Sequence, residues 1–100
     1  MANKEIVKQG REAIRKMYIA YNALDAKHKG FFELYHDAML YQLEGAKEDA
    51  NDINYYLSVE GGVSINKAEL CLQNIKDALG YMQGVIKMQK IAEKLYMIYA

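Results

Sequence analysis

Apolar residues recur along most of this chain at alternating steps of three and four, the spacing of one face of an α-helix. Two short groups of turn residues divide the pattern into three stretches. The sequence of 100 residues contains no proline and only seven glycines, so little of it can be loop. We therefore predict one all-α domain over residues 1–100, an antiparallel bundle of helices at about 3–29, 31–59 and 65–99, completed by homo-oligomerisation.

Each predicted helix carries at least one seam, by which we mean the line of apolar residues that faces the core. The seam of the first helix consists of Ile6, Gly10, Ala13, Met17, Ala20 and Leu24. The seam of the second helix consists of Phe32, Tyr35, Met39, Leu43, Ala46, Ala50, Ile53 and Leu57. Such spacing lets helices pack nearly antiparallel with interdigitated side chains.

The third helix carries two adjacent seams, which predicts that it contacts more than one neighbour. The first of these consists of Ile65, Ala68, Leu72, Ile75, Leu79, Met82 and Ile86. The second consists of Cys71, Ala78, Tyr81, Val85, Met88, Ala92, Leu95 and Tyr99.

The turn before the third helix is predicted from two consecutive glycines. Gly61 and Gly62 can adopt the left-handed conformation that ends a helix. Ser64 is a good N-cap for the next helix, and Val63 can pack on Ala68.

The first turn is predicted at Lys27-His28-Lys29-Gly30, because basic residues followed by glycine are typical of a helix C-terminus. Two alternatives remain open at this boundary. One ends the first helix between Asn22 and Asp25, with Asp25 capping the second helix. The other keeps residues 3–59 as a single bent helix.

A third helix of this length would extend roughly 50 Å, beyond the reach of the first helix. Its apolar end would then stay exposed, and exposed apolar patches usually mark an interface. Gly80 and Gly84, four residues apart, would allow another helix to cross closely. We therefore predict self-association through an oligomer interface that contains Gly80, Gly84, Leu95, Tyr96 and Tyr99.

The formal net charge is zero, yet the charges are unevenly placed. The first helix carries a basic stripe opposite its seam, made of Lys4, Lys8, Arg11 and Arg15. The second helix carries an acidic stripe with apolar residues among its carboxylates, made of Glu33, Leu34, Asp37, Tyr41, Glu44, Glu48, Asp52 and Tyr55. Like charges one turn apart destabilise a helix slightly, so their repetition leaves two interpretations open, solvated outer faces or stripes that take part in recognition. The basic stripe could meet phosphates or an acidic protein, the acidic stripe a basic protein, and the two could pair between subunits.

The segment Glu33-Leu-Tyr-His36 resembles in spacing half of the ligand set of ferritin-like di-iron bundles. A dimer could supply two such motifs, with Glu5 or Glu12 as a further ligand. However, the helical wheel places Glu33 away from His36, so the sequence predicts neither a metal site nor a cofactor.

Catalysis has little support in the sequence. Cys71 lies on an apolar seam, where a thiol is buried and inert. Ser58 and Ser64 flank the predicted turn, and Gly61-Gly62 lacks the flanking residues of a phosphate-binding loop. We predict no catalytic residues.

A single cysteine, a charged N-terminus and the lack of a long apolar run favour a cytoplasmic protein without a membrane segment. The expected function is a non-enzymatic interaction module that binds itself and a protein partner as an adaptor, inhibitor or regulator. Two alternatives are nucleic-acid binding through the basic stripe and a dimeric carboxylate–histidine metal protein.

Overall fold

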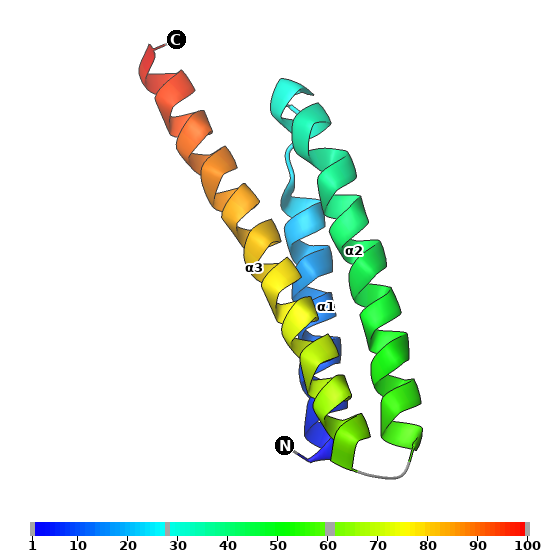
Figure 1. Cartoon of the computed structure of the whole chain (residues 1–100). Coiled ribbons are helices and arrows are strands. Elements are labelled where there is room, and N and C mark those ends of the chain that lie inside the picture. Colours follow the sequence, from blue (N-terminus) through cyan, green and yellow to red (C-terminus); the bar gives the residue numbers. More distant parts are fainter. Residues whose placement is uncertain (1, 28, 60–61, 100) are drawn as a thin grey trace.

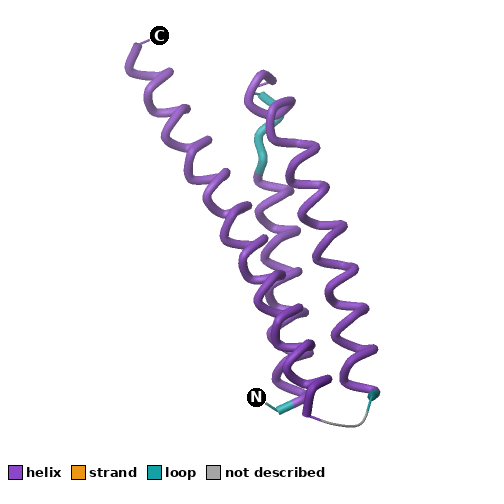
Figure 2. Tube along the Cα trace, viewed as in Figure 1, coloured by secondary structure: helices purple, strands orange, loops and turns teal. Residues whose placement is uncertain are grey.

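In the computed structural model, the chain forms an antiparallel bundle of α1 (Asn3–Ala23), α2 (Lys29–Ser58) and α3 (Gly62–Tyr99) (Figures 1 and 2). The structure describes residues 2–27, 29–59 and 62–99. Each helix packs against the other two, which gives the bundle a triangular cross-section. The molecule is elongated, with extents of 60 × 20 × 16 Å. The predicted all-α bundle is confirmed.

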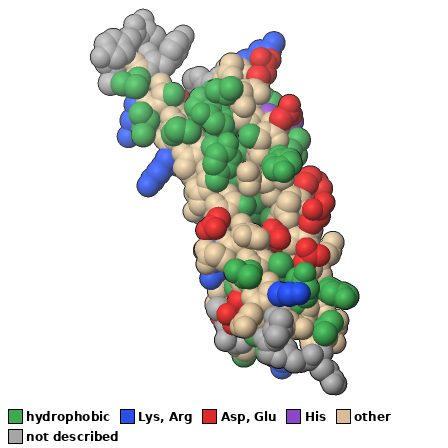
Figure 3. All heavy atoms as spheres, viewed as in Figure 1, with side chains coloured by type: hydrophobic (Ala, Val, Ile, Leu, Met, Phe, Trp, Pro, Cys, Tyr) green, Lys and Arg blue, Asp and Glu red, His purple; other side chains and the backbone are tan. Residues whose placement is uncertain are grey.

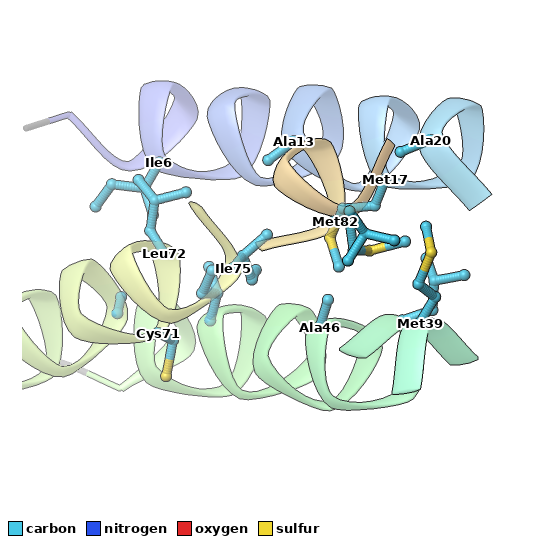
Figure 4. Close-up of a cluster of buried hydrophobic side chains, with 14 of the residues drawn as sticks. Ile6, Ala13, Met17, Ala20, Met39, Ala46, Cys71, Leu72, Ile75 and Met82 are labelled. Carbon is cyan, nitrogen blue, oxygen red and sulfur yellow. The ribbon is translucent and has the colours of Figure 1, made fainter. Parts of the chain in front are cut away.

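The predicted seams form the core between the three helices (Figure 4). The α1 seam is buried along its whole length: Ile6, Gly10, Ala13, Met17, Ala20 and Leu24. The centre of the core consists of Met39, Leu43, Ala46 and Ile53 from α2 with Ala68, Cys71, Leu72, Ile75, Met82 and Val85 from α3. The rest of the α2 seam and of the first α3 seam is half-buried against this core. Both α3 seams contribute buried residues, so the prediction of two neighbours for this helix is confirmed.

Gly10 lies where α1 faces side chains of both α2 and α3. A Cβ atom built on Gly10 would lie 3.8 Å from Ile53 Cδ1, 3.9 Å from Leu72 Cδ1 and 4.0 Å from Ile75 Cδ1. These are ordinary van der Waals distances, so the site has room for a methyl group.

We expect Gly10→Ala to raise the free energy of unfolding by about 0.5–1 kcal/mol, because alanine favours the helix and the new methyl group is buried. Urea denaturation measures the change. Gly45→Ala is the matched control, since its added Cβ would touch nothing within 4 Å and it reports helix propensity alone. A gain for Gly45→Ala with a loss for Gly10→Ala would contradict the packing described here.

The predicted C-terminus of the first helix, at Lys29, is wrong. The helix ends at Ala23, and Leu24 has an extended backbone with φ −63° and ψ 118°. Lys29 and Gly30 instead belong to the first turn of α2. The alternative break between Asn22 and Asp25 is confirmed, and the single bent helix over 3–59 is excluded because residues 24–27 are not helical.

The physical reason for the early end lies in contacts with α3. Leu24, the first residue after the helix, still places its side chain in the core, where it is 6% exposed. The Asp25 backbone N–H donates a hydrogen bond of 3.0 Å to Oε1 of Gln89. The Asp25 carboxylate in turn accepts from the Lys27 N–H at 2.8 Å, so it stabilises the turn and does not cap α2 as predicted.

The predicted start of the third helix, at Ile65, is also wrong, since α3 already begins at Gly62. Ser64 is therefore helical and does not act as the N-cap. The apolar pattern predicts only the buried part of a helix. The first turn of the helix can lie before that part, as it does in α3. The contact predicted for the Val63 side chain and the conformation predicted for Gly61 lie outside the described residues.

The unequal helix lengths leave part of α3 uncovered. This helix has 38 residues against 21 in α1, and its C-terminal half leans away from α2 (Figure 1). The second α3 seam is buried at Cys71 and Val85 but exposed at Met88 (45%) and Leu95 (51%). The predicted apolar overhang is thus present up to Leu95.

Candidate functional site

The acidic stripe lies along the outward side of α2. Its apolar members are unusually exposed: Leu34 69%, Tyr41 77% and Tyr55 65%. All five carboxylates of the stripe are exposed as well. Figure 3 shows acidic side chains along the edge of the molecule that α2 forms. The structure therefore brings the predicted acidic residues together on one accessible surface.

Local contacts engage three of the five carboxylates of this stripe, since Asp37 lies 3.2 Å from Nδ1 of His36 and two others lie near lysines. Glu33 lies 3.7 Å from the Lys29 ammonium group, and Glu44 lies 3.5 Å from that of Lys47. A hydrogen bond with Tyr18 and the Glu44 carboxylate raise the pKa of Lys47. Such exposed pairs contribute little free energy and are easily exchanged for a partner's charges.

The basic stripe lies on the outer side of α1, where Lys4, Lys8, Arg11 and Arg15 are all exposed. Arg15 pairs with Glu12 at 3.2 Å. The other three line an open hollow between α1 and the C-terminal end of α2, together with Val7, Asn54, Leu57 and other residues. The predicted basic surface is thus accessible, with three of its charges around one hollow.

An open groove lies between α1 and α3, and the sequence did not predict it. Its floor and walls are mainly small or apolar, and its rim is basic. It is lined by Lys16, Ile19, Ala20, Ala23, Gly80, Gln83, Gly84, Ile86, Lys87 and Lys90.

The two glycines predicted to support a close helix crossing lie in this groove. A Cβ added at Gly80 or Gly84 would meet nothing within 4 Å, so α3 makes no such crossing inside the described chain. The crossing predicted between subunits stays a prediction. Of the other predicted interface residues, Leu95 is 51% exposed, and the side chains of Tyr96 and Tyr99 lie outside the described residues.

His36 is engaged by its neighbours within the bundle. Its Nε2 atom lies 2.9 Å from the Tyr21 hydroxyl, and its Nδ1 atom lies 3.2 Å from the Asp37 carboxylate. Glu33 instead faces Lys29.

The further ligands considered for a metal site lie far from His36. The helices are antiparallel, with Gly10 beside Ile53 and Tyr21 beside His36, so Glu5 and Glu12 are toward the other end of the bundle. The ferritin-like ligand set therefore does not assemble within one chain, and its dimeric form stays a prediction.

A cluster at the α2–α3 contact was missed by sequence reasoning. One ligand atom each of Asp49, Asp52 and Cys71 lies within 4.8 Å of the others. Burial, followed by the charges of Asp49 and Asp52, raises the pKa of the Cys71 thiol. The raised pKa favours the protonated thiol, and the burial of Cys71 expected from its seam is confirmed.

The ionised form of the Asp49 carboxyl is disfavoured in the folded state. Burial, opposed by a hydrogen bond from Asn74, raises the pKa of this carboxyl, and the charges of Asp52 and Glu48 raise it further. The folded state thus binds a proton at a higher pH than the unfolded state does. The ionised carboxylate consequently destabilises the fold at neutral pH, and this cost disappears as the pH falls through the raised pKa.

We expect Asp49→Asn to raise the urea midpoint at about pH 7, with the difference from wild type vanishing at about pH 3, where carboxyls are protonated in both states. Asparagine keeps an oxygen that can accept from Asn74. Asp77→Asn, an exposed carboxyl on α3, is the control and should change little. A stability loss at neutral pH would show that the charge of Asp49 stabilises the fold.

None of the described helices combines the length and the apolar character needed to cross a membrane. Comparison with known proteins finds no family model that matches the chain, no similar curated protein and no similar solved structure.

Proposed function

We propose that this protein is a small helical interaction module that self-associates and presents its charged helix faces to a macromolecular partner, as an adaptor, inhibitor or regulator would. The activity proposed is binding without catalysis. Among the described residues, the only thiol is buried with a raised pKa, and the described histidine is held by Tyr21 and Asp37.

The observation that carries this proposal is the acidic stripe. Leu34 and Tyr41 lie two helical turns apart, are more than two thirds exposed, and have Glu33, Asp37 and Glu44 alongside them. An apolar residue that exposed contributes nothing to the core, and aromatic residues are frequent anchors of interfaces. A stripe that combines apolar anchors with a rim of one charge is suited to bind a basic protein surface.

Charge reversal on the stripe tests the proposal. We expect Glu44→Lys with Glu48→Lys to abolish the capture of specific proteins from an extract of the native host, as quantified by mass spectrometry. The control variant, Glu12→Lys with Asp77→Lys, changes the net charge by the same amount but on α1 and α3. It should still capture these proteins. If all three forms capture the same proteins in the same amounts, the stripe is only a solvated surface.

A second candidate function is nucleic-acid binding at the basic hollow of α1. The observation in its favour is that Lys4, Lys8 and Arg11 line one hollow together with Asn54, whose amide can hydrogen-bond a phosphate or a base. Fluorescence anisotropy with a short duplex across salt concentrations tests this function. Binding through three contacts predicts a slope of about −3 in log K against log salt, which Lys8→Glu should reduce. Binding that does not change with salt excludes it.

A further inference from the structure

We propose that the groove between α1 and α3 is the acceptor for the acidic stripe of a second copy of this chain, so that the protein associates head to tail. This inference rests on the proposed function in one respect, namely that the acidic stripe is a docking surface. It adds the site that receives the stripe and the identity of the occupant.

Charge complementarity identifies the occupant. The rim of the groove carries Lys16, Lys87 and Lys90, all exposed and without a hydrogen bond or ion pair to any residue in the described part of the chain. The acidic stripe offers three carboxylates alongside its two anchors, Glu33, Asp37 and Glu44. Their local partners are exposed or neighbouring side chains on α2, and such weak surface pairs can be exchanged for the lysines of the groove. Opposite charges placed around an apolar centre steer association and set its register.

The dimensions of the two surfaces also agree. The groove follows α3 from Gly80 to Lys90, which is about 15 Å of helix. The segment of the stripe from Glu33 to Glu44 extends about 17 Å. A helix laid in the groove can approach closely, because nothing lies within 4 Å of the Cβ positions of Gly80 and Gly84.

Apolar contacts would accompany this approach. Ile19, in the wall of the groove, is 56% exposed, and the half-buried Ile86 lies on the opposite helix. Leu34 and Tyr41 of the second copy are the side chains that would cover them. The arrangement is that of an amphipathic helix in an apolar groove, anchored at two residues that lie two turns apart on one face.

The position of the two surfaces determines the form of the assembly. On a helical wheel the acidic stripe covers an arc of about 100° centred nearly opposite the buried residues of α2. In a triangular bundle, that direction points away from the groove between α1 and α3. A pair of molecules can therefore use one stripe and one groove, leaving a free stripe at one end and a free groove at the other. Such heterologous contacts build open chains or rings and not a closed twofold dimer.

Two variants, each disabling one surface, test the proposal by sedimentation velocity of the purified protein across concentrations. Gly84→Glu fills the groove and adds a negative charge, and the fold tolerates it because the space is open and glutamate favours helices. Leu34→Ser with Tyr41→Ser removes the anchors of the stripe. Leu70→Ser is the matched control, since Leu70 is 67% exposed on α3 outside both surfaces.

We expect the wild type and Leu70→Ser to grow beyond dimers as the concentration rises. Each disabling variant should associate at least about 30-fold more weakly. An equimolar mixture of the two variants should form dimers that do not grow, because one intact stripe meets one intact groove. Circular dichroism of each variant confirms that it is folded.

Three results overturn the proposal. In the first, the wild type remains monomeric or stops at a dimer. In the second, the mixture of variants remains monomeric. In the third, Gly84→Glu associates like the wild type while Leu34→Ser with Tyr41→Ser does not, which refutes the groove as acceptor and leaves the proposed function of the stripe intact. Failure of the proposed function itself is read from the capture experiment with Glu44→Lys and Glu48→Lys.

Discussion

Replacing Ile75 with alanine is expected to lower the free energy of unfolding by about 3 kcal/mol. Ile75 is fully buried, and its Cδ1 atom lies 4.0 Å from the Cβ position of Gly10, where the three helices meet. Truncation removes apolar burial and leaves a cavity that three packed helices cannot easily close. Domains of this size have unfolding free energies of about 5–15 kcal/mol, so the loss is a large part of the total.

Equilibrium denaturation with urea measures this loss. Leu70→Ala is the matched control on the same helix, because Leu70 is 67% exposed and its truncation should change stability by less than about 0.5 kcal/mol. Equal effects of the two substitutions would mean that Ile75 does not occupy the centre of the core.

The second large effect is expected at Gln89, the only buried polar residue among those described, at 4% exposure. Its Oε1 atom accepts the hydrogen bond from the Asp25 N–H, and its Nε2 atom donates to the Glu93 carboxylate at 3.4 Å and, more weakly, to the Ala23 carbonyl at 3.5 Å. Gln89 thus holds the end of α1 and the following turn against α3.

We expect Gln89→Met to destabilise the protein by about 1–3 kcal/mol, because it keeps the volume of the side chain but leaves the Asp25 N–H without its partner. Hydrogen exchange gives a local readout, in which the Asp25 amide should lose protection while the centre of α3 keeps it. Gln73→Met, at an exposed position of α3, is the control and should leave stability almost unchanged. An unchanged Asp25 amide would show that the turn is held by other contacts.

The sequence by itself determined the three helices, their seams and their charged outer faces. All of these depend on periodicity, which is local: residues three or four apart share a face whatever the rest of the chain does. For this reason Met17, Met39 and Met82 could be placed in the core, and Tyr41 and Tyr55 on the outside, before the structure was known.

Features that depend on residues distant in the sequence were decided only by the tertiary structure. The turn after Ala23 is hydrogen-bonded to Gln89, more than sixty positions away, so the basic residues at 27–29 were a misleading local signal. Likewise Tyr21 meets His36, and Asp49 and Asp52 meet Cys71, only because antiparallel helices bring them into register.

The groove between α1 and α3 is also a feature that only the tertiary structure decided. Lys16 and Lys87 are unremarkable in the sequence, and the glycines of α3 indicated a crossing without a location. Their assembly into one surface, on the side of the bundle opposite the acidic stripe, required the packing of α1 against α3. Periodicity determines which side of each helix is buried, whereas the relative placement of two helices follows from how their side chains fit together, and that fit is a property of the whole fold.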